Sequence, residues 1–255
     1  MRQRRIAEQL ECMIMYCGEP TIDCCITSIE DQTLLPSRIT VIEDVTPLSE
    51  SINERHRSMM KPFSVKVDAD CVLYKDCFAI LYRAMMKRGD KCYATSVQTL
   101  DPFVGQEGGI HLERSALLKD LVVPDLIGCD RWIRQVMEQR GYEFYEMDHL
   151  MAEHWSDWSW QHVFEKSMRM GQKHLYYKNK RHEWVRGFAK RWLKGNPTAF
   201  IAILGYCYGL LTPDDKEKGP GFAQDELGIV AGLVKDGVIP EPDALWSLRK
   251  KREKK

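Results

Sequence analysis

The sequence lacks the features that mark membrane-spanning, secreted and zinc-ribbon proteins. Its longest apolar run, from Thr198 to Leu211, falls short of the about 20 residues that a helix needs to cross a bilayer. The basic segment from Met1 to Arg5 is not followed by an apolar stretch, so we expect no secretory signal. The nine cysteines include no Cys-x-x-Cys pair, and the chain has no internal repeat or low-complexity tract.

Net charge is also lacking, because 37 basic residues balance 37 acidic ones. Bulk charge therefore does not indicate a nucleic-acid or membrane partner. An odd number of cysteines without a secretory signal favours buried, reduced thiols and a cytoplasmic location. The length of 255 residues and the 44% of hydrophobic residues allow one large domain with an appendage.

The first 90 residues alternate between two kinds of segment. Apolar, β-branched runs predict strands at 12–16, 38–42 and 63–67, and apolar residues at helical spacing predict helices at 21–32, 49–60 and 76–87. This alternation predicts an α/β fold with a mixed, mainly parallel sheet flanked by helices. Further strands are expected at 91–99, 108–113 and 142–147, and further helices at 115–119 and 131–140.

The composition changes near residue 166. Ten basic residues and one acidic residue lie between 166 and 194, and Trp184, Phe188 and Trp192 recur every fourth position. We expect a first domain at 1–165 and a basic, aromatic, helical extension at 166–255. This extension is interpreted as an amphipathic helix docking on the main domain, a helix at a membrane surface, or a face for polyanions such as nucleic acid.

Acidic residues stand where the predicted strands end. Asp68 and Asp70 follow the third strand, at a spacing that lets two carboxylates reach one Mg²⁺ or Mn²⁺ ion. Segments 16–19 and 43–44 follow the first two strands. Because ligands bind beyond the carboxyl ends of parallel strands, these segments should converge on one crevice. The alternative for Asp68 and Asp70 is an ordinary loop at a strand end.

Two later residues are candidates for the same crevice. Asp130 begins a helix, where the helix dipole favours a carboxylate, and the alternative is a plain N-cap. His154 follows the strand at 142–147 in an expected loop, and the alternative is a structural histidine.

Several short motifs, in the order in which they occur along the chain, resemble those of a family 2 glycosyltransferase. That family has the GT-A fold, a Rossmann-like α/β architecture. The resemblance covers roughly residues 11–160 and is carried by several short motifs. They are Tyr16-Cys17-Gly18-Glu19, Ser28-Ile29-Glu30-Asp31-Gln32, Val41-Ile42-Glu43-Asp44, Val67-Asp68-Ala69-Asp70, Gly128-Cys129-Asp130-Arg131-Trp132 and His154-Trp155-Ser156.

The resemblance implies a role for each matching residue. Asp130 would be the catalytic base, Asp70 the direct metal ligand, and His154 a further metal or diphosphate contact. The nucleotide would be held by Tyr16, Glu19, Glu43, Asp44 and Asp68. The sequence departs from the family where Cys129 replaces a usual acid and where the Arg-Asn stretch is not evident, so that Asn53, Arg55 or Arg57 is expected to supply that nucleotide contact.

The implied activity is a metal-dependent, inverting transfer of a sugar from a nucleoside diphosphate sugar to an acceptor hydroxyl. The family suggests UDP, with Mn²⁺ or Mg²⁺ as the cofactor, and the acceptor is a glycan, a lipid-linked molecule at a membrane surface, or a polyanion. A nucleotidyltransferase would need a glycine- and basic-rich loop after the first strand, where Gly18-Glu19-Pro20 stands instead. The third interpretation is a non-catalytic protein that binds nucleic acid or a membrane surface through 166–194.

Overall fold

The computed structural model describes residues 6–101, 105–126, 128–155, 159–174, 181–196 and 198–212, together with Lys235. The chain divides into two compact units, residues 1–156 and 157–255, which are described separately. The boundary expected between residues 165 and 166 lies inside the first helix of the second unit, α7 (Trp160–His174).

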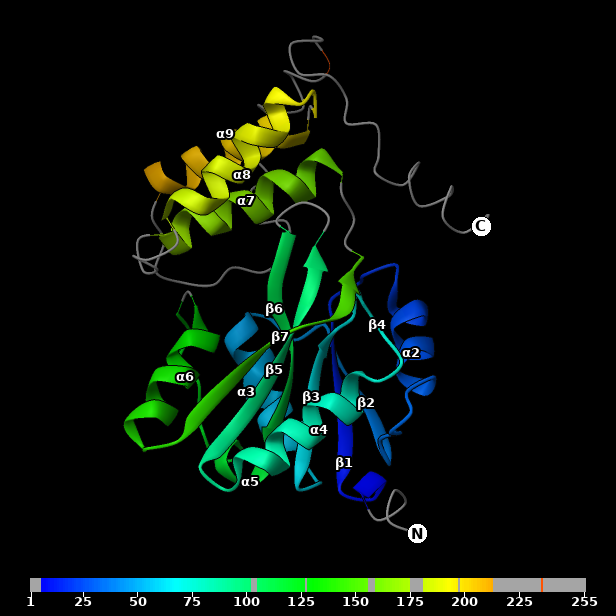
Figure 1. Cartoon of the computed structure of the whole chain (residues 1–255). Coiled ribbons are helices and arrows are strands. Elements are labelled where there is room, and N and C mark those ends of the chain that lie inside the picture. The colour runs from blue at the N-terminus through cyan, green and yellow to red at the C-terminus, as the bar shows by residue number, and fades with distance from the viewer. Residues whose placement is uncertain are drawn as a thin grey trace. The chain divides into compact units, whose positions relative to one another are not determined.

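A seven-stranded sheet forms the centre of the first unit, in the order β2-β1-β3-β6-β5-β7-β4 (Figure 1). The strands are β1 (Leu10–Tyr16), β2 (Arg38–Glu43), β3 (Phe63–Asp68), β4 (Cys71–Leu73), β5 (Cys92–Asp101), β6 (Gly105–Arg114) and β7 (Glu143–His154). β1 is parallel to β2 and β3, and β5 is parallel to β7. β6 is antiparallel to both β3 and β5, and β4 to β7. All strands except β4 and β6 therefore run in one direction, which confirms the predicted mixed, mainly parallel sheet.

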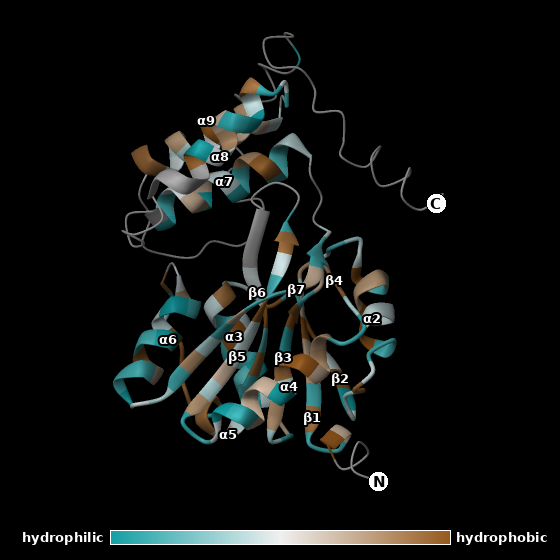
Figure 2. Cartoon of the chain, in the orientation of Figure 1, coloured by the Kyte–Doolittle hydropathy of each residue, from teal (hydrophilic) through white to brown (hydrophobic). Residues whose placement is uncertain are grey.

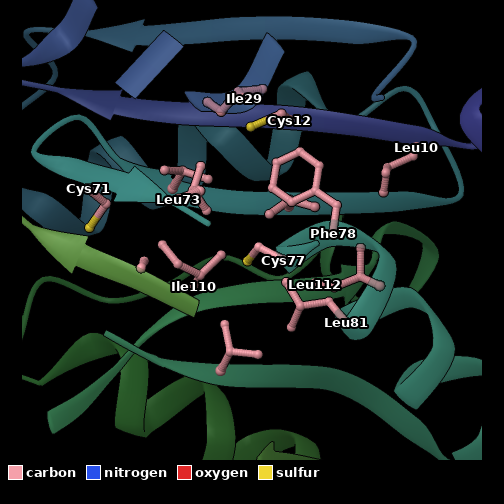
Figure 3. Close-up of a cluster of buried hydrophobic side chains, with 14 of the residues drawn as sticks. Leu10, Cys12, Ile29, Cys71, Leu73, Cys77, Phe78, Leu81, Ile110 and Leu112 are labelled. Atoms are coloured by element: carbon pink, nitrogen blue, oxygen red, sulfur yellow. The ribbon is translucent and has the colours of Figure 1, made fainter. Parts of the chain in front are cut away.

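Helices cover both faces of this sheet. They are α2 (Ile22–Glu30), α3 (Leu48–Ser58), α4 (Cys77–Arg88), α5 (Ser115–Leu118) and α6 (Cys129–Gln139). Residues of α2 and α4 join one apolar cluster, which Figure 3 shows around Phe78 and Leu81. Residues of α3, α5 and α6 join the second. Figure 2 shows apolar residues along the central strands and mostly hydrophilic residues along α6.

The strand β1 is buried on both faces, which explains its continuous apolar sequence. Cys12 and Ile14 belong to the cluster formed with α2 and α4, whereas Met13 and Met15 belong to the opposite cluster. Successive side chains of a strand point to opposite faces, so a central strand between two helical layers needs apolar residues at every position. The continuous apolar sequence that predicted a buried strand at 12–16 therefore follows from burial of β1 on both faces.

The structure differs from expectation at the end of β7. Glu153 and His154, expected in a loop, are the last residues of β7, where they pair with the short strand β4. The three residues of β4 were not predicted as a strand, because so short a segment shows no period. The strand exists because its pairing with β7 satisfies its backbone groups, and that partner lies about 80 residues away along the chain.

The second unit contains α7, α8 (Arg181–Leu193) and α9 (Thr198–Leu211), as the expected helical extension requires. α7 and α9 approach closely at two glycines of α9. A Cβ atom at Gly205 would lie 2.4 Å from the carbonyl oxygen of Phe164, and one at Gly209 would lie 2.0 Å from that of Met168. None of the described helices is both long and apolar enough to cross a membrane.

The aromatic stripe of α8, formed by Trp184, Phe188 and Trp192, has both buried and exposed members. Phe188 is buried, whereas Trp192 is half-exposed and contacts the ring of Phe200. The side chain of Trp184 lies outside the described residues. One part of the stripe therefore stabilises the helical unit itself.

Candidate active site

The strands that share one direction all end in polar side chains. These terminal residues are Glu43 of β2, Tyr16 of β1, Asp68 of β3, Asp101 of β5 and His154 of β7. Because their carboxyl ends meet at the same edge of the sheet, a polar edge forms there, where α/β folds bind ligands. The structure places the segments expected to converge, 16–19, 43–44 and 68–70, along this edge.

His154 lies between two carboxylates. Its Nε2 is 2.8 Å from Oδ2 of Asp70, and its Nδ1 is 2.8 Å from Oδ2 of Asp101. Asp101 is fully buried, and the parallel pairing of Leu100 with Glu153 brings the ends of β5 and β7 together. The two predicted metal-site residues, Asp70 and His154, are thus adjacent, although they are distant in sequence.

This arrangement suits a divalent cation. A neutral imidazole carries one N–H group, so it can donate to only one of the two carboxylates. When Nδ1–H donates to Asp101, the lone pair of Nε2 faces an oxygen of Asp70. A cation bound by Nε2 and the Asp70 carboxylate would satisfy both groups, and a buried carboxylate behind a ligating histidine is typical of metal sites. The residues present therefore fit a metal ion.

Glu19 stands in the turn after β1, close to the same acids. Its Oε2 accepts a hydrogen bond of 2.7 Å from the backbone N–H of Cys17. Burial raises the pKa of Glu19, and the charges of Asp70 and Asp68 raise it further, although hydrogen bonds to the carboxylate oppose them. A cation at this edge would relieve the repulsion among these carboxylates.

Three further predicted residues lie at the ends of β1 and β2. Tyr16 is half-buried, and its carbonyl oxygen accepts a hydrogen bond of 3.0 Å from the N–H of Asp44. Asp44 has a φ of 51°, a left-handed conformation that is uncommon for residues other than glycine. Glu43 and Asp44 have exposed side chains and are open to a ligand.

Asp130 reaches the same edge through a lysine that sequence reasoning missed. Nζ of Lys66 lies 3.9 Å from Oδ2 of Asp130 and 3.7 Å from Oδ1 of Asp68. Burial by itself would lower the pKa of Lys66, but the carboxylates of Asp130 and Asp68 raise it above its ordinary value. Asp130 lies in the first turn of α6, whose N-cap is Gly128, so the alternative of a plain N-cap is wrong.

Two of the three α3 residues expected to supply a nucleotide contact, Asn53 and Arg55, are engaged inside the fold. Asn53 exchanges hydrogen bonds of 3.0 and 2.7 Å with the backbone of Val123. Arg55 is buried and forms an ion pair with Glu113. Arg57 is exposed and pairs with Glu54. Asn53 and Arg55 therefore hold α3 in place.

The missed residues left weak signals in the sequence. Asp101 lies two residues beyond the predicted strand at 91–99, much as Asp68 follows the predicted strand at 63–67, so the same pattern of an acid after a strand marks it. Lys66 stands inside an apolar strand, where a charge needs a buried partner. Neither signal indicates which residue Asp101 or Lys66 contacts, because these contacts join segments that are distant in the sequence.

Comparisons with known proteins support the fold. No family model and no curated protein matches the sequence. A mannosyltransferase from Pyrobaculum calidifontis, solved with GDP-Man and Mn²⁺, matches over 89% of this chain and 80% of its own, with 14% identity and a TM-score of 0.50. This likeness shows a GT-A-like fold.

Two other solved structures match less closely. TarS of S. aureus matches over 71% of this chain and 42% of its own, with 11% identity and a TM-score of 0.45. Glucosyl-3-phosphoglycerate synthase from Mycobacterium tuberculosis, solved with Mg²⁺ and UDP, matches over 59% and 72%, with 12% identity and a TM-score of 0.45.

Proposed function

We propose that the protein is a metal-dependent, inverting glycosyltransferase of the family 2 type, which moves a sugar from a nucleoside diphosphate sugar to an acceptor hydroxyl. The observation that carries this proposal is the convergence of Asp70 and His154, supported by buried Asp101, at the carboxyl edge of a GT-A-like sheet. An imidazole beside a carboxylate suits Mn²⁺ better than Mg²⁺, because Mg²⁺ prefers oxygen ligands alone.

The donor is assigned to the ends of β1, β2 and β3. Tyr16, Glu43 and Asp44 border the place for the base and ribose, and UDP is the nucleotide that the family resemblance favours. Glu19 and Asp68 lie beside the metal site, where the diphosphate would bind. The turn after β1 holds Gly18-Glu19-Pro20 in place of the glycine- and basic-rich loop that a nucleotidyltransferase needs, which argues against that activity.

The chemistry needs a base opposite the leaving group. The metal ion, when bound, neutralises the negative charge that develops on the departing diphosphate. Asp130 takes the proton of the acceptor hydroxyl as the oxygen attacks the anomeric carbon from the opposite face, which inverts that centre. Lys66 positions the carboxylate of Asp130, since its ammonium group lies between Asp130 and Asp68.

The acceptor is proposed only by class: a glycan, a lipid-linked molecule or a polyanion. The basic residues of α8 place positive charge in the second unit, which would suit a polyanion or an anionic membrane surface. Acceptor binding that weakens steeply with added salt is expected for both.

Calorimetric titration of UDP, with GDP in parallel, tests the donor site. We expect UDP to bind more tightly with Mn²⁺ than without it, because an ion held by Asp70 and His154 would offset the negative charge of the diphosphate. Asp70→Asn should remove this dependence on Mn²⁺. Asp90→Asn is the matched control, since Asp90 is fully exposed at the opposite edge of the sheet. Metal-independent binding, or no binding of either nucleotide, would contradict the proposal.

Replacement of Asp101 tests how His154 is oriented. We expect Asp101→Asn to weaken Mn²⁺ binding by about 10–100-fold, because an amide holds the imidazole less firmly than a carboxylate. Electron paramagnetic resonance of free Mn²⁺ measures the affinity directly. Asp148→Asn, on the exposed part of β7, is the control. Equal Mn²⁺ affinities in the Asp101 variant and the wild type would show that Asp101 does not support the site.

A further inference from the structure

We propose that Cys71 is a third protein ligand of the metal centre formed by Asp70 and His154, so that the site prefers Zn²⁺ or Co²⁺ to Mn²⁺ and Mg²⁺. This inference rests on the proposed function, because it concerns the same metal site. It changes the interpretation of Cys71 from a small buried apolar residue to a ligand.

The sheet brings the three side chains together. β4 and β7 are antiparallel, and their register places Cys71 directly opposite His154. Side chains of directly opposed residues lie on the same face of a sheet, so the thiol and the imidazole share one side. Asp70 precedes Cys71 in the turn between β3 and β4. The position of the three residues is therefore set by backbone pairing.

The donor atoms surround one point. One ligand atom from each of Asp70, Cys71 and His154 lies within 4.8 Å of the other two. Sγ of Cys71 is 3.9 Å from Oδ1 of Asp70, and Nε2 of His154 is 2.8 Å from Oδ2. Tetrahedral Zn²⁺, with bonds of about 2.0–2.3 Å, places its donor atoms roughly 3.3–3.6 Å apart. To reach this geometry, Nε2 of His154 and the Asp70 carboxylate would move apart by roughly half an ångström, and the Cys71 thiol would move toward both.

The chemistry of the donors decides which metal is favoured. Mg²⁺ takes oxygen ligands in an octahedral arrangement, and a thiol and an imidazole offer it little. Zn²⁺ and Co²⁺ accept sulfur, nitrogen and oxygen together, and both bind a given site of this kind more tightly than Mn²⁺ does. Three protein ligands leave a fourth position for water or a phosphate oxygen, as in catalytic zinc sites.

The surroundings of Cys71 also suit a ligand. Cys71 is 2% exposed and lies at one end of the apolar cluster in Figure 3, away from Leu10 and Leu81. Asp101 holds Nδ1 of His154, which leaves Nε2 directed at Asp70. Within the described part of the chain, no other cysteine stands in a group of three such donors.

Titration of the reduced, metal-free protein with Co²⁺ tests the proposal. A thiolate bound to Co²⁺ gives a charge-transfer absorption in the near ultraviolet, which oxygen and nitrogen ligands do not give. We expect this band to saturate at one Co²⁺ per chain and to disappear in Cys71→Ser. Zn²⁺ should remove the band at far lower concentration than Mg²⁺ does.

Two matched variants identify the sulfur. Cys77→Ser replaces an equally buried thiol in α4, and Cys17→Ser replaces an exposed thiol in the turn after β1. Both should keep the band. Should Cys71→Ser fail to fold, X-ray absorption at the cobalt edge of the wild type decides, with a sulfur neighbour at about 2.3 Å as the expected result.

Co²⁺ binding without the band, a band that persists in Cys71→Ser, or an absence of sulfur around cobalt would overturn the role of Cys71. The titration of UDP with Mn²⁺ separates this failure from failure of the proposed function. Metal-dependent binding of UDP without a thiolate band would support the proposed glycosyltransferase and would assign its metal site oxygen and nitrogen ligands only. Loss of both signals would overturn both proposals.

Discussion

Replacing Asp130 by asparagine is expected to lower kcat by about 10²–10⁴-fold while the affinity for the donor nucleotide stays nearly unchanged. An amide has almost the same shape as a carboxylate but cannot take the proton of the acceptor hydroxyl. The donor is assigned to the ends of β1, β2 and β3, whereas Asp130 lies on α6, so nucleotide binding should survive. Release of UDP measures turnover, and calorimetry measures donor affinity.

The control must remove a charge from the same helix. Glu138→Gln does so near the far end of α6, where Glu138 pairs with Arg134, and it should leave turnover unchanged. Asp130→Asn also removes a negative charge beside Lys66, which contacts Asp68 as well. Asp130→Glu keeps this charge and moves the carboxylate, so it separates the effect of the charge from that of the carboxylate's position. Near-normal turnover in Asp130→Asn would show that another group is the base.

The configuration of the product tests the same residue independently. Attack from the face opposite the diphosphate gives a product of inverted anomeric configuration, which nuclear magnetic resonance reads during the first turnovers. A product that retains the donor's configuration would contradict the direct role of Asp130, even if the variant were inactive.

Replacing Glu113 by alanine is expected to lower the free energy of unfolding by about 3–5 kcal/mol. The ion pair between Arg55 and Glu113 is buried, and Arg55 also contacts Nε2 of His56. Removal of Glu113 leaves the guanidinium in the core without its carboxylate. Denaturant unfolding measures the loss, and donor binding should fall only as far as the folded fraction falls.

The double variant Arg55→Met with Glu113→Leu separates the unpaired charge from lost packing. Replacement of a buried pair by apolar side chains of similar size is often neutral, so the double variant should recover most of the loss. A double variant as unstable as Glu113→Ala alone would show that packing, rather than the unpaired charge, causes the loss.

The pH dependence of stability follows from the same pair. Burial by itself would raise the pKa of Glu113, but Arg55 outweighs burial and holds this pKa below its usual value. The ion pair therefore stabilises the fold fully above the unfolded pKa of about 4.3, and this stabilisation is lost as the pH falls through the lower folded pKa. Glu113→Gln should lack this part of the acid sensitivity.

The sequence by itself determined the elements and their general order. β1 is buried on both faces, so its apolar run is continuous, whereas β3 alternates Phe63, Val65 and Val67 with polar residues. The helices α2 and α4 are buried on one face, so their apolar residues recur at helical spacing. The acids at the ends of β2 and β3 could be found for a similar reason, since a change from apolar to acidic residues marks the edge of a sheet. Local patterns of this kind are complete within a few residues.

Only the tertiary structure decided which side chains meet. His154 joins Asp70 because β4 pairs with the end of β7, and Asp101 joins His154 because β5 pairs with the same strand. Lys66 meets Asp130 because α6 packs on the face of the sheet to which Met13 and Met15 point. Such contacts depend on strand register and helix packing across distant segments, and the pattern of any one segment leaves both undetermined.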